Sequence, residues 1–326
     1  MLAPENMPKR ILEVTGTMEN KIGKKDREEE EKEGEIGNKE KESLETEGSN
    51  VLNNIFSLLR NRKGTDFTYY KKTTVSRRVL RRMAINEKED PVDYLQYLKE
   101  NPKEQDVLYQ DLLIPVTNFF RDIHIIENLC NTVFPNILKN LDKDKPIRIW
   151  TAGCSTGEEA YTIAICLLEY LENPSRELPI GEGPKVQIFG TDISEPAIAK
   201  ARAGIYKKNE VEGLSSKRLE NYFTKIDGSY QIDKKVREIC VFALHNFLKD
   251  PPFGKMDFIS CRNVLIYMEP YLQKKALTTF HYSLKPKGDL LLGKSETISS
   301  VPDLLTVEDK KDKLFSRKDK PGKFKH

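Results

Sequence analysis

The stretch Ile147–Tyr161, IRIWTAGCSTGEEAY, decides the fold of this chain. Its first four residues, Ile147–Trp150, form a short apolar run that is typical of a buried strand. Residues 152–157 are small and predict a tight turn, and a helix begins at Glu158. Strand, turn and helix in this order are typical of an α/β protein, so we expect a mostly parallel sheet covered by helices.

The turn itself has two interpretations. Gly153 and Gly157 let the backbone pass close to a bound molecule, because neither carries a Cβ. Ser155 and Thr156 are candidates to cap the following helix. A gapped glycine pair after a strand also serves close packing of a helix on a strand. The turn alone therefore leaves open whether it binds a ligand.

The composition is that of a soluble globular protein with one unusually charged portion. A length of 326 residues allows two folded units, and the formal charge of +3 neither requires nor excludes a nucleic acid or membrane partner. The five cysteines contain no CxxC pair and the four histidines have no metal-ligand spacing. We therefore expect reduced thiols, no metal site and a cytoplasmic location. The sequence contains no apolar run long enough to span a bilayer and no signal-peptide core.

Residues 1–48 differ sharply from the rest of the chain. They include KKDREEEEKEGEIGNKEKE, in which almost no side chain could be buried. We expect this segment to be a disordered tail. A single charged helix over Asp26–Glu33 is the alternative, but Gly34 and Gly37 would interrupt it.

Residues 49–113 predict a small all-helical N-terminal domain of four or five short helices, because apolar residues recur there at helical spacing. Residues 61–66 and 86–91 are the expected connections. The positions that carry this pattern are Val51, Ile55, Leu58, Leu59, Val75, Val79, Leu80, Met83, Tyr94, Leu95, Leu98, Val107, Leu108 and Leu112.

Four arginines lie within two turns of the second predicted helix, at Arg77, Arg78, Arg81 and Arg82. One interpretation is a solvated helix face with extended side chains. The other is a docking stripe for an acidic partner, because a cluster of one charge sign steers association.

The segment Leu112–Asp122, LLIPVTNFFRD, joins the two predicted domains. Pro115 ends the preceding helix, and Thr117 or Asn118 can cap a next helix that carries the two phenylalanines and Arg121. Adjacent phenylalanines at a helix start are usually core residues. An arginine set against apolar surface needs a partner, so Arg121 is a candidate functional residue.

A second predicted strand, Val186–Gly190, ends in Thr191 and Asp192. Nucleotide-binding folds use an acidic side chain at this place to bind ribose hydroxyls, so Asp192 is a candidate ribose ligand. Capping of a helix that begins near Ser194 is the alternative role. The spacing from Gly157 exceeds that of the dinucleotide fingerprint, which disfavours a nicotinamide cofactor.

The remaining elements complete an α/β domain that runs from residue 114 to 318, with a tail at 319–326. Alternation in SYQIDKKVREICVFAL predicts two short antiparallel strands in an insert at about 204–242. The buried strand MDFISC, a helix over Pro270–Leu284, the turn KPKG, the strand DLLLGKSE and a last strand near Lys313–Arg317 follow. A terminal antiparallel hairpin on an otherwise parallel sheet is expected.

Six segments occur in series: TNFFRD, TAGCSTGEEAY, GTDIS, LHNFLKD, SCRNVLIY and LKPKGDLLLGKSET. Together they resemble the CheR-type chemotaxis receptor methyltransferases, which move a methyl group from S-adenosylmethionine to receptor glutamates. The resemblance covers about residues 52–318. It implies a Rossmann-like class I methyltransferase domain with a seven-stranded sheet and a small antiparallel β insert, and S-adenosylhomocysteine as the second product.

The resemblance also implies a set of site residues. The residue matching Asp192 holds the ribose in that family, and those matching Asn246 and Phe247 lie by the adenine. Pro115 stands where some relatives carry Asn, so no side-chain contact is expected there. Glu158 and Glu159 are adjacent, and which of them meets the cofactor stays open. The implied cofactor-binding residues are Thr117, Arg121, Glu159, Asp192, Asn246, Phe247, Arg262 and Asn263.

Arg121 and Tyr267 match residues that flank the methyl group and are the implied catalytic pair. A receptor glutamate is already ionised at neutral pH, so methyl transfer needs no strong general base. An Arg can orient the carboxylate and a Tyr hydroxyl can lie on the transfer line. We expect Arg121→Ala to lose transfer far more than Tyr267→Phe loses fold stability.

The tetrapeptide Asp250–Phe253, DPPF, looks like the motif that amino-group methyltransferases place after their fourth strand. Here the fourth strand is MDFISC, which follows the tetrapeptide, so we interpret DPPF as a turn.

In the resembled family the helical domain and the insert contact the receptor, so the arginine cluster becomes a docking site for glutamate-rich receptor helices. The short insert favours recognition without a C-terminal receptor peptide. We expect a monomer that binds no nucleic acid and does not insert into a membrane. The alternatives are a methyltransferase for a small molecule or nucleic acid, and a non-catalytic S-adenosylmethionine sensor.

Overall fold

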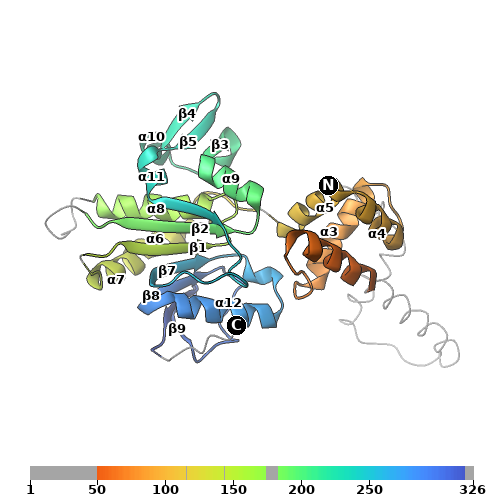
Figure 1. Cartoon of the computed structure of the whole chain (residues 1–326). Helices are drawn as coiled ribbons and strands as arrows, with labels where there is room; N and C mark the ends of the chain where they lie inside the picture. Colours follow the sequence, from red (N-terminus) through yellow and green to blue (C-terminus); the bar gives the residue numbers. More distant parts are fainter. Residues whose placement is uncertain (1–49, 115, 143, 174–182, 320–326) are drawn as a thin grey trace, which may run out of the picture. The chain divides into compact units, whose positions relative to one another are not determined.

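The computed structural model describes residues 50–114, 116–142, 144–173 and 183–319 (Figure 1). The chain divides into two compact units after Ile114. The predicted tail at 1–48 and residues 320–326 of the predicted C-terminal tail lie outside the described residues. Every helix in the described ranges is too short or too polar to cross a lipid bilayer.

The first unit is all helical, as predicted. It contains a helix over residues 50–63, followed by α3 (Lys72–Ile85), α4 (Pro91–Glu100) and α5 (Pro102–Leu113). Prolines at the first position of α4 and α5 fit the unpaired N–H groups there, and the Asp90 carboxylate accepts the Val92 N–H. The core of the unit consists of Val51, Ile55, Phe56, Leu59, Phe67, Val75, Val79, Met83, Tyr94, Leu95, Leu98, Leu108, Tyr109 and Leu112.

Arg82 does not belong to an exposed arginine stripe, which corrects the sequence interpretation. Its guanidinium donates to both carboxylate oxygens of Glu104 at 2.9 and 2.6 Å, and both side chains are largely buried. Asn86 and the Tyr94 hydroxyl donate to the same carboxylate. Arg82 therefore ties α3 to α5, and only the other three arginines of the cluster remain available at the surface.

The second unit contains a seven-stranded sheet in the order β6-β2-β1-β7-β8-β10-β9. The first five of these strands pair in parallel, and β10 pairs antiparallel with both β8 and β9. This confirms the predicted Rossmann-like sheet with a terminal antiparallel hairpin. The strands are β1 (Ile147–Ala152), β2 (Val186–Asp192), β6 (Cys240–Leu244), β7 (Met256–Cys261), β8 (Leu284–Leu292), β9 (Leu305–Asp309) and β10 (Leu314–Arg317).

Helices cover the sheet in Figure 1. Ile149 of β1 belongs to the apolar core that includes residues of α6, α7 and α8. Trp150, the next residue, packs edge-on against Phe253 and Phe280, because successive strand residues face opposite sides. The helices of this unit are α6 (Ile123–Asn131), α7 (Val133–Lys139), α8 (Glu158–Leu171), α9 (Glu195–Ala203), α10 (Ser216–Tyr222), α11 (Lys234–Glu238) and α12 (Pro270–Ser283), with short 3-10 turns η2 (Lys208–Glu210) and η3 (Leu265–Tyr267).

A separate three-stranded antiparallel sheet projects from the second unit (Figure 1). It consists of β3 (Ile205–Lys207), β5 (Ser229–Ile232) and β4 (Phe223–Ile226), in that order. The predicted insert was thus right in kind but too long. Its supposed second strand is β6, which pairs in parallel with β2 in the main sheet.

The predicted turn KPKG is also wrong, because β8 runs from Leu284 through Leu292 without a break. The register between β7 and β8 shifts between Met256 and Phe258, and Lys287 has a positive φ of 63°. The strand therefore absorbs the Pro and Gly as an irregularity beside its partner.

The free energy of unfolding should depend on pH because of Asp289 in β8. It is buried and accepts a hydrogen bond from Asn136 at 3.1 Å, and burial raises the pKa of its carboxyl from 3.8 to about 6. Because the folded pKa is the higher one, this group stabilises the fold below about pH 4, and the contribution disappears as the pH rises through 6. Through this group the wild type should lose ~3 kcal/mol of its free energy of unfolding between pH 4 and 7, and Asp289→Asn should not show this loss. Urea unfolding followed by the fluorescence of Trp150, the single tryptophan, measures this difference. Parallel pH profiles for both proteins would contradict it.

Candidate functional site

The carboxyl ends of β1, β2 and β7 lie side by side, and the turn after β1 is tied to the end of β2. The N–H groups of Gly153 and Cys154 both donate to the Thr191 carbonyl, at 2.8 and 2.9 Å. Ligands of open α/β sheets bind at this edge. A ligand site is therefore expected at the turn at 153–157 and the loops beside it.

The two glycines of this turn are needed for packing. Gly153 and Gly157 have φ values of 74° and 97°, which disfavour other residues. A Cβ on Gly153 would lie 2.5 Å from a methyl of Val264, and one on Gly157 would lie 2.8 Å from Ala201. The space beside each glycine is thus filled by the protein itself, which favours the packing interpretation of the glycine pair.

The predicted caps of α8 are also wrong. Gly157 is the N-cap, and no side chain caps it. The hydroxyl of Thr156 instead donates to the carboxylate of Glu158, which is buried, and burial raises the pKa of that carboxyl. Ser155 contributes its backbone N–H to the Asp192 carboxylate at 2.9 Å.

Asp192 joins the two turns at this edge. One carboxylate oxygen accepts the Ser155 N–H, and the other accepts the Ser194 N–H at 2.9 Å. Ser194, and not Asp192, caps α9 through its own hydroxyl. Burial raises the pKa of Asp192, and the backbone N–H groups act against this shift. A carboxylate has about four acceptor positions, so lone pairs of Asp192 stay available for hydroxyl donors of a ligand.

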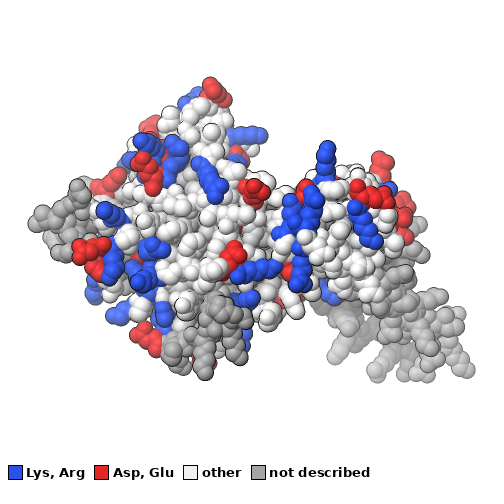
Figure 2. Space-filling model, viewed as in Figure 1, with Lys and Arg blue, Asp and Glu red and all other residues white. Residues whose placement is uncertain are grey.

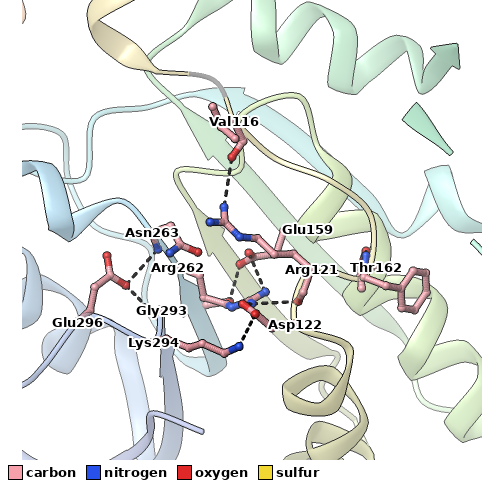
Figure 3. A network of polar contacts seen from close by, with 12 residues as sticks. Val116, Arg121, Asp122, Glu159, Thr162, Arg262, Asn263, Gly293, Lys294 and Glu296 are labelled. Atoms are coloured by element: carbon pink, nitrogen blue, oxygen red, sulfur yellow. Dashed lines mark hydrogen bonds and ion pairs between the residues drawn. The ribbon is translucent and has the colours of Figure 1, made fainter. Parts of the chain in front are cut away.

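A buried ion-pair network lies at the end of β7 (Figure 3). The Arg262 side chain is 1% exposed and bridges two carboxylates, Asp122 at 2.7 Å and Glu159 at 3.3 Å. It also donates to the Arg121 carbonyl at 3.0 Å. Ser260 donates to the second oxygen of Glu159 at 2.7 Å. Arg262 therefore connects β7, the first turn of α8 and the segment before α6.

Asp122 also forms an ion pair with a second cation. Lys294 lies 2.7 Å from its other oxygen and is half exposed. Burial acts to raise the pKa of Asp122, but the hydrogen bond from Lys294 and the charge of Arg262 outweigh it, so the pKa of Asp122 is lowered. The carboxylate is therefore ionised throughout the neutral range.

The segment before α6 is a series of turns rather than the start of a helix. Phe120 and Asp122 have positive φ values of 51° and 56°, and α6 begins only at Ile123. Both phenylalanines are buried, as predicted, and the Phe120 N–H donates to the Thr162 hydroxyl of α8 at 3.0 Å. Thr117 lies in the same irregular segment and is partly buried.

The Arg121 side chain is held loosely at this edge. Its guanidinium donates to the Val116 carbonyl at 3.3 Å, and the side chain is partly exposed (Figure 3). Among the described residues, none forms an ion pair with it at 4 Å or less. Most of its five N–H donors are therefore available to a ligand.

The loop after β6 holds Asn246 and Phe247. The Asn246 side-chain oxygen accepts the Leu248 N–H, and its backbone N–H donates to Asp250 at 2.7 Å. Phe247 is buried 5.4 Å from the ring of Phe280. DPPF lies in this loop between β6 and β7, with its Phe ring packed against Trp150; the turn itself is at 247–249, just before the tetrapeptide.

Arg262, Asn263 and Tyr267 follow β7 directly. Asn263 has a positive φ of 60°, and Tyr267 ends the short turn η3. Sequence reasoning missed the residue that binds this turn, Glu296, whose carboxylate accepts four backbone N–H groups. It also missed Asp122. The available signal for Glu296 was the one used for Asp192, an acidic residue just after a buried strand.

Comparisons with known proteins identify the two units. Residues 50–113 match the family model "CheR methyltransferase, all-alpha domain", and residues 115–314 match "CheR methyltransferase, SAM binding domain". The chain is 32% identical over 251 residues to Chemotaxis protein methyltransferase 2 of Vibrio cholerae, covering 75% of this chain and 84% of that protein. It is 35% identical over 190 residues to Chemotaxis protein methyltransferase Cher2 of Pseudomonas putida, covering 57% and 67%.

A further relative is much longer than this chain. An uncharacterized 104.1 kDa protein of Rhodobacter capsulatus is 38% identical over 261 residues. The match covers 80% of this chain and 27% of that protein, so this chain spans about a quarter of that relative's length.

Proposed function

The chain belongs to the CheR methyltransferase family, and we propose that it transfers the methyl group of S-adenosylmethionine to glutamate side chains of chemotaxis receptors. The products are glutamate methyl esters and S-adenosylhomocysteine. The observation that carries the proposal is the match of residues 115–314 to the family's S-adenosylmethionine-binding domain, with two relatives named as chemotaxis methyltransferases. The substrate and the roles of individual residues are our inference.

The polar groups at the sheet edge fit S-adenosylmethionine, the cofactor of this domain. Asp192 retains acceptor capacity that suits ribose hydroxyls. The Ser155 hydroxyl and the Asn263 side-chain oxygen are buried and have no hydrogen-bond partner within the described ranges. Buried polar atoms are normally paired, so a ligand with hydroxyl and amino groups would satisfy them. Asn246 and Phe247 are the proposed adenine contacts, and Thr117 is a further proposed contact.

Glu159 is the better candidate of the two adjacent glutamates. Its carboxylate belongs to the Arg262 network beside the end of β7, whereas Glu158 is buried and bonded to Thr156. We assign Arg262 a positioning role toward Glu159, because its own side chain is almost completely covered. Glu159 and Asn263 then belong to the cofactor site, with Arg262 behind them.

When bound, the cofactor supplies a methyl group on a positively charged sulfur, which a carboxylate oxygen can displace in line. The protein has to orient that carboxylate and remove water from it. Arg121 is suited to the first task, because its guanidinium has free donors in a geometry that matches a carboxylate. We assign the Tyr267 hydroxyl to the line of transfer. These two residues are the proposed catalytic groups.

Receptor docking is proposed for the exposed arginines of α3. Arg77 and Arg81 are exposed and Arg78 is partly exposed, and no acidic residue among those described pairs with them. Figure 2 shows Lys and Arg side chains close together on the visible face of the first unit, where Figure 1 labels α3. A positive helix face attracts glutamate-rich receptor helices and accelerates the encounter.

Replacing these three arginines with alanine should weaken receptor binding severalfold at low salt and reduce its salt dependence, with little change in stability. Arg82→Ala is the matched control from the same helix. It should instead destabilise the first unit by about 3 kcal/mol, because it leaves Glu104 buried without its cation. Binding to a receptor cytoplasmic fragment at two salt concentrations, together with thermal unfolding, separates the two effects. Unchanged receptor affinity in the triple variant would favour the other interpretation, in which the arginines form a solvated helix face.

The function is tested by incubating the chain with methyl-labelled S-adenosylmethionine and three acceptors in parallel: receptor-containing membranes, nucleic acid and a small-molecule extract. Label on the receptors supports the proposal. Label on another acceptor would instead identify a different methyltransferase. Cofactor binding without transfer to any acceptor would indicate a sensing module.

A further inference from the structure

The chain makes an irregular turn between β7 and η3. It leaves the strand at Cys261, takes a left-handed conformation at Asn263 and enters η3 at Leu265. The N–H groups of Asn263, Val264 and Ile266 donate to one carboxylate, that of Glu296, at 3.1, 2.9 and 3.3 Å. Figure 3 shows the contact from Asn263. A single side chain thus substitutes for the backbone partners that this turn lacks.

Glu296 is itself fixed by a tight turn at the end of β8. Its backbone N–H donates to the Gly293 carbonyl at 2.9 Å, and the Gly293 N–H donates back to the carboxylate at 2.6 Å. A Cβ on Gly293 would lie 2.8 Å from both the carboxylate and the Asn263 nitrogen. Glycine is therefore required at 293 for Glu296 to reach the turn after β7.

This carboxylate is buried, with only 4% of the residue exposed. Burial raises the pKa of Glu296, and the backbone N–H groups act in the opposite direction. None of the described Lys, Arg or His side chains forms an ion pair with it. Four N–H dipoles replace the missing cation, as in other anion-binding backbone concavities.

The turn that Glu296 organises carries three residues of the proposed site: Arg262 precedes it, Asn263 lies in it and Tyr267 ends it. The Asn263 side-chain oxygen is buried and lacks a partner among the described residues. An oxygen left in this state needs a donor, which a ligand with amino or hydroxyl groups provides. The direction of that oxygen depends on the left-handed backbone that Glu296 holds.

We propose that Glu296 is a positioning residue for the cofactor site: its carboxylate fixes the backbone of residues 263–266 and so sets where Asn263 and Tyr267 meet the ligand. The inference rests on the proposed function for the identity of that ligand. Its test uses binding of S-adenosylhomocysteine, which needs no methyl acceptor.

The experiment measures the Kd of S-adenosylhomocysteine for the full chain by calorimetry, together with the melting temperature. Glu296→Gln keeps the shape but presents an amide group to backbone donors, so we expect the Kd to rise about tenfold or more. Asp289→Asn is the matched control, since it also converts a buried carboxylate to an amide but lies in the middle of β8. It should leave the Kd unchanged.

Asn263→Gly keeps the inference testable if Glu296→Gln does not fold. Glycine accepts the positive φ, so the melting temperature should stay near wild type while the Kd rises about tenfold. The double variant should bind no more weakly than Glu296→Gln alone, because both changes remove one interaction. If Glu296 had a purely structural role, the effects of the two changes on the Kd would instead be additive.

A purely structural Glu296 would lower the melting temperature of Glu296→Gln and leave the Kd at wild type well below melting. That result, or an unchanged Kd in Asn263→Gly, would overturn the inference. Wild-type binding of S-adenosylhomocysteine without any methyl transfer would reject the proposed function but leave this inference intact. Absence of binding by the wild type would reject both.

Discussion

Arg121→Ala should reduce methyl transfer to receptor glutamates by about a thousandfold. The Arg121 guanidinium is partly exposed and is held only by the Val116 carbonyl at 3.3 Å, so its remaining donors can orient a carboxylate. The structural contact of this residue is made by its backbone carbonyl, which accepts from Arg262 and survives the substitution. The fold should therefore persist while the acceptor loses its orientation.

Initial rates at saturating S-adenosylmethionine and varied receptor concentration measure this effect. Arg148→Ala is a matched control, because Arg148 is also partly buried but lies at the start of β1, at the opposite end of the strand from the site. It should retain most of the activity. Tyr267→Phe should leave the melting temperature nearly unchanged. An Arg121→Ala protein with near-wild-type methylation would remove Arg121 from the reaction.

Arg262→Met should destabilise the second unit by about 3 to 5 kcal/mol. The substitution leaves Glu159 without its cation and Asp122 with Lys294 alone, in a place where the Arg262 side chain is 1% exposed. An uncompensated buried carboxylate costs more than the pair itself contributes. Urea unfolding followed by Trp150 fluorescence reports on this unit, since β1 carries the only tryptophan.

Lys294→Ala provides the control for this experiment, because Lys294 binds the same Asp122 carboxylate but is 53% exposed. An exposed pair contributes little, so the loss should be below about 1 kcal/mol. Equal losses in the two variants would show that burial of Arg262 does not set its contribution. The comparison contrasts a buried guanidinium that binds both Asp122 and Glu159 with an exposed ammonium group that binds Asp122 alone.

Local patterns in the sequence were sufficient for the elements that face the core. The apolar run at Ile147–Trp150, the apolar helix α8 and the strand ending in Asp192 all lie where they were expected. The edge strand β6 was misassigned because only its central residue, Phe242, is buried, so it lacks the continuous apolar burial that is typical of a parallel strand. Its parallel pairing with β2 depends on residues far away in the chain.

Polar contacts across long sequence separations could not be predicted. Ser155 was expected to cap the following helix, but its backbone N–H instead donates to Asp192, which is 37 residues further on. Arg82 looked like a surface residue because Glu104, its partner, lies 22 residues away on another helix. Glu296 is 33 residues from Asn263. The family resemblance supplied the candidate ligands, whereas these supporting residues became visible only with the fold.

We propose that glutamate methylation takes place at the edge formed by β1, β2 and β7. The most direct measurement is peptide mass mapping of a receptor cytoplasmic fragment after incubation with the chain and methyl-labelled S-adenosylmethionine. We predict one added methyl group on glutamate residues, released as methanol by mild base. Label on another residue type, or label that resists base, would contradict glutamate methylation by this chain.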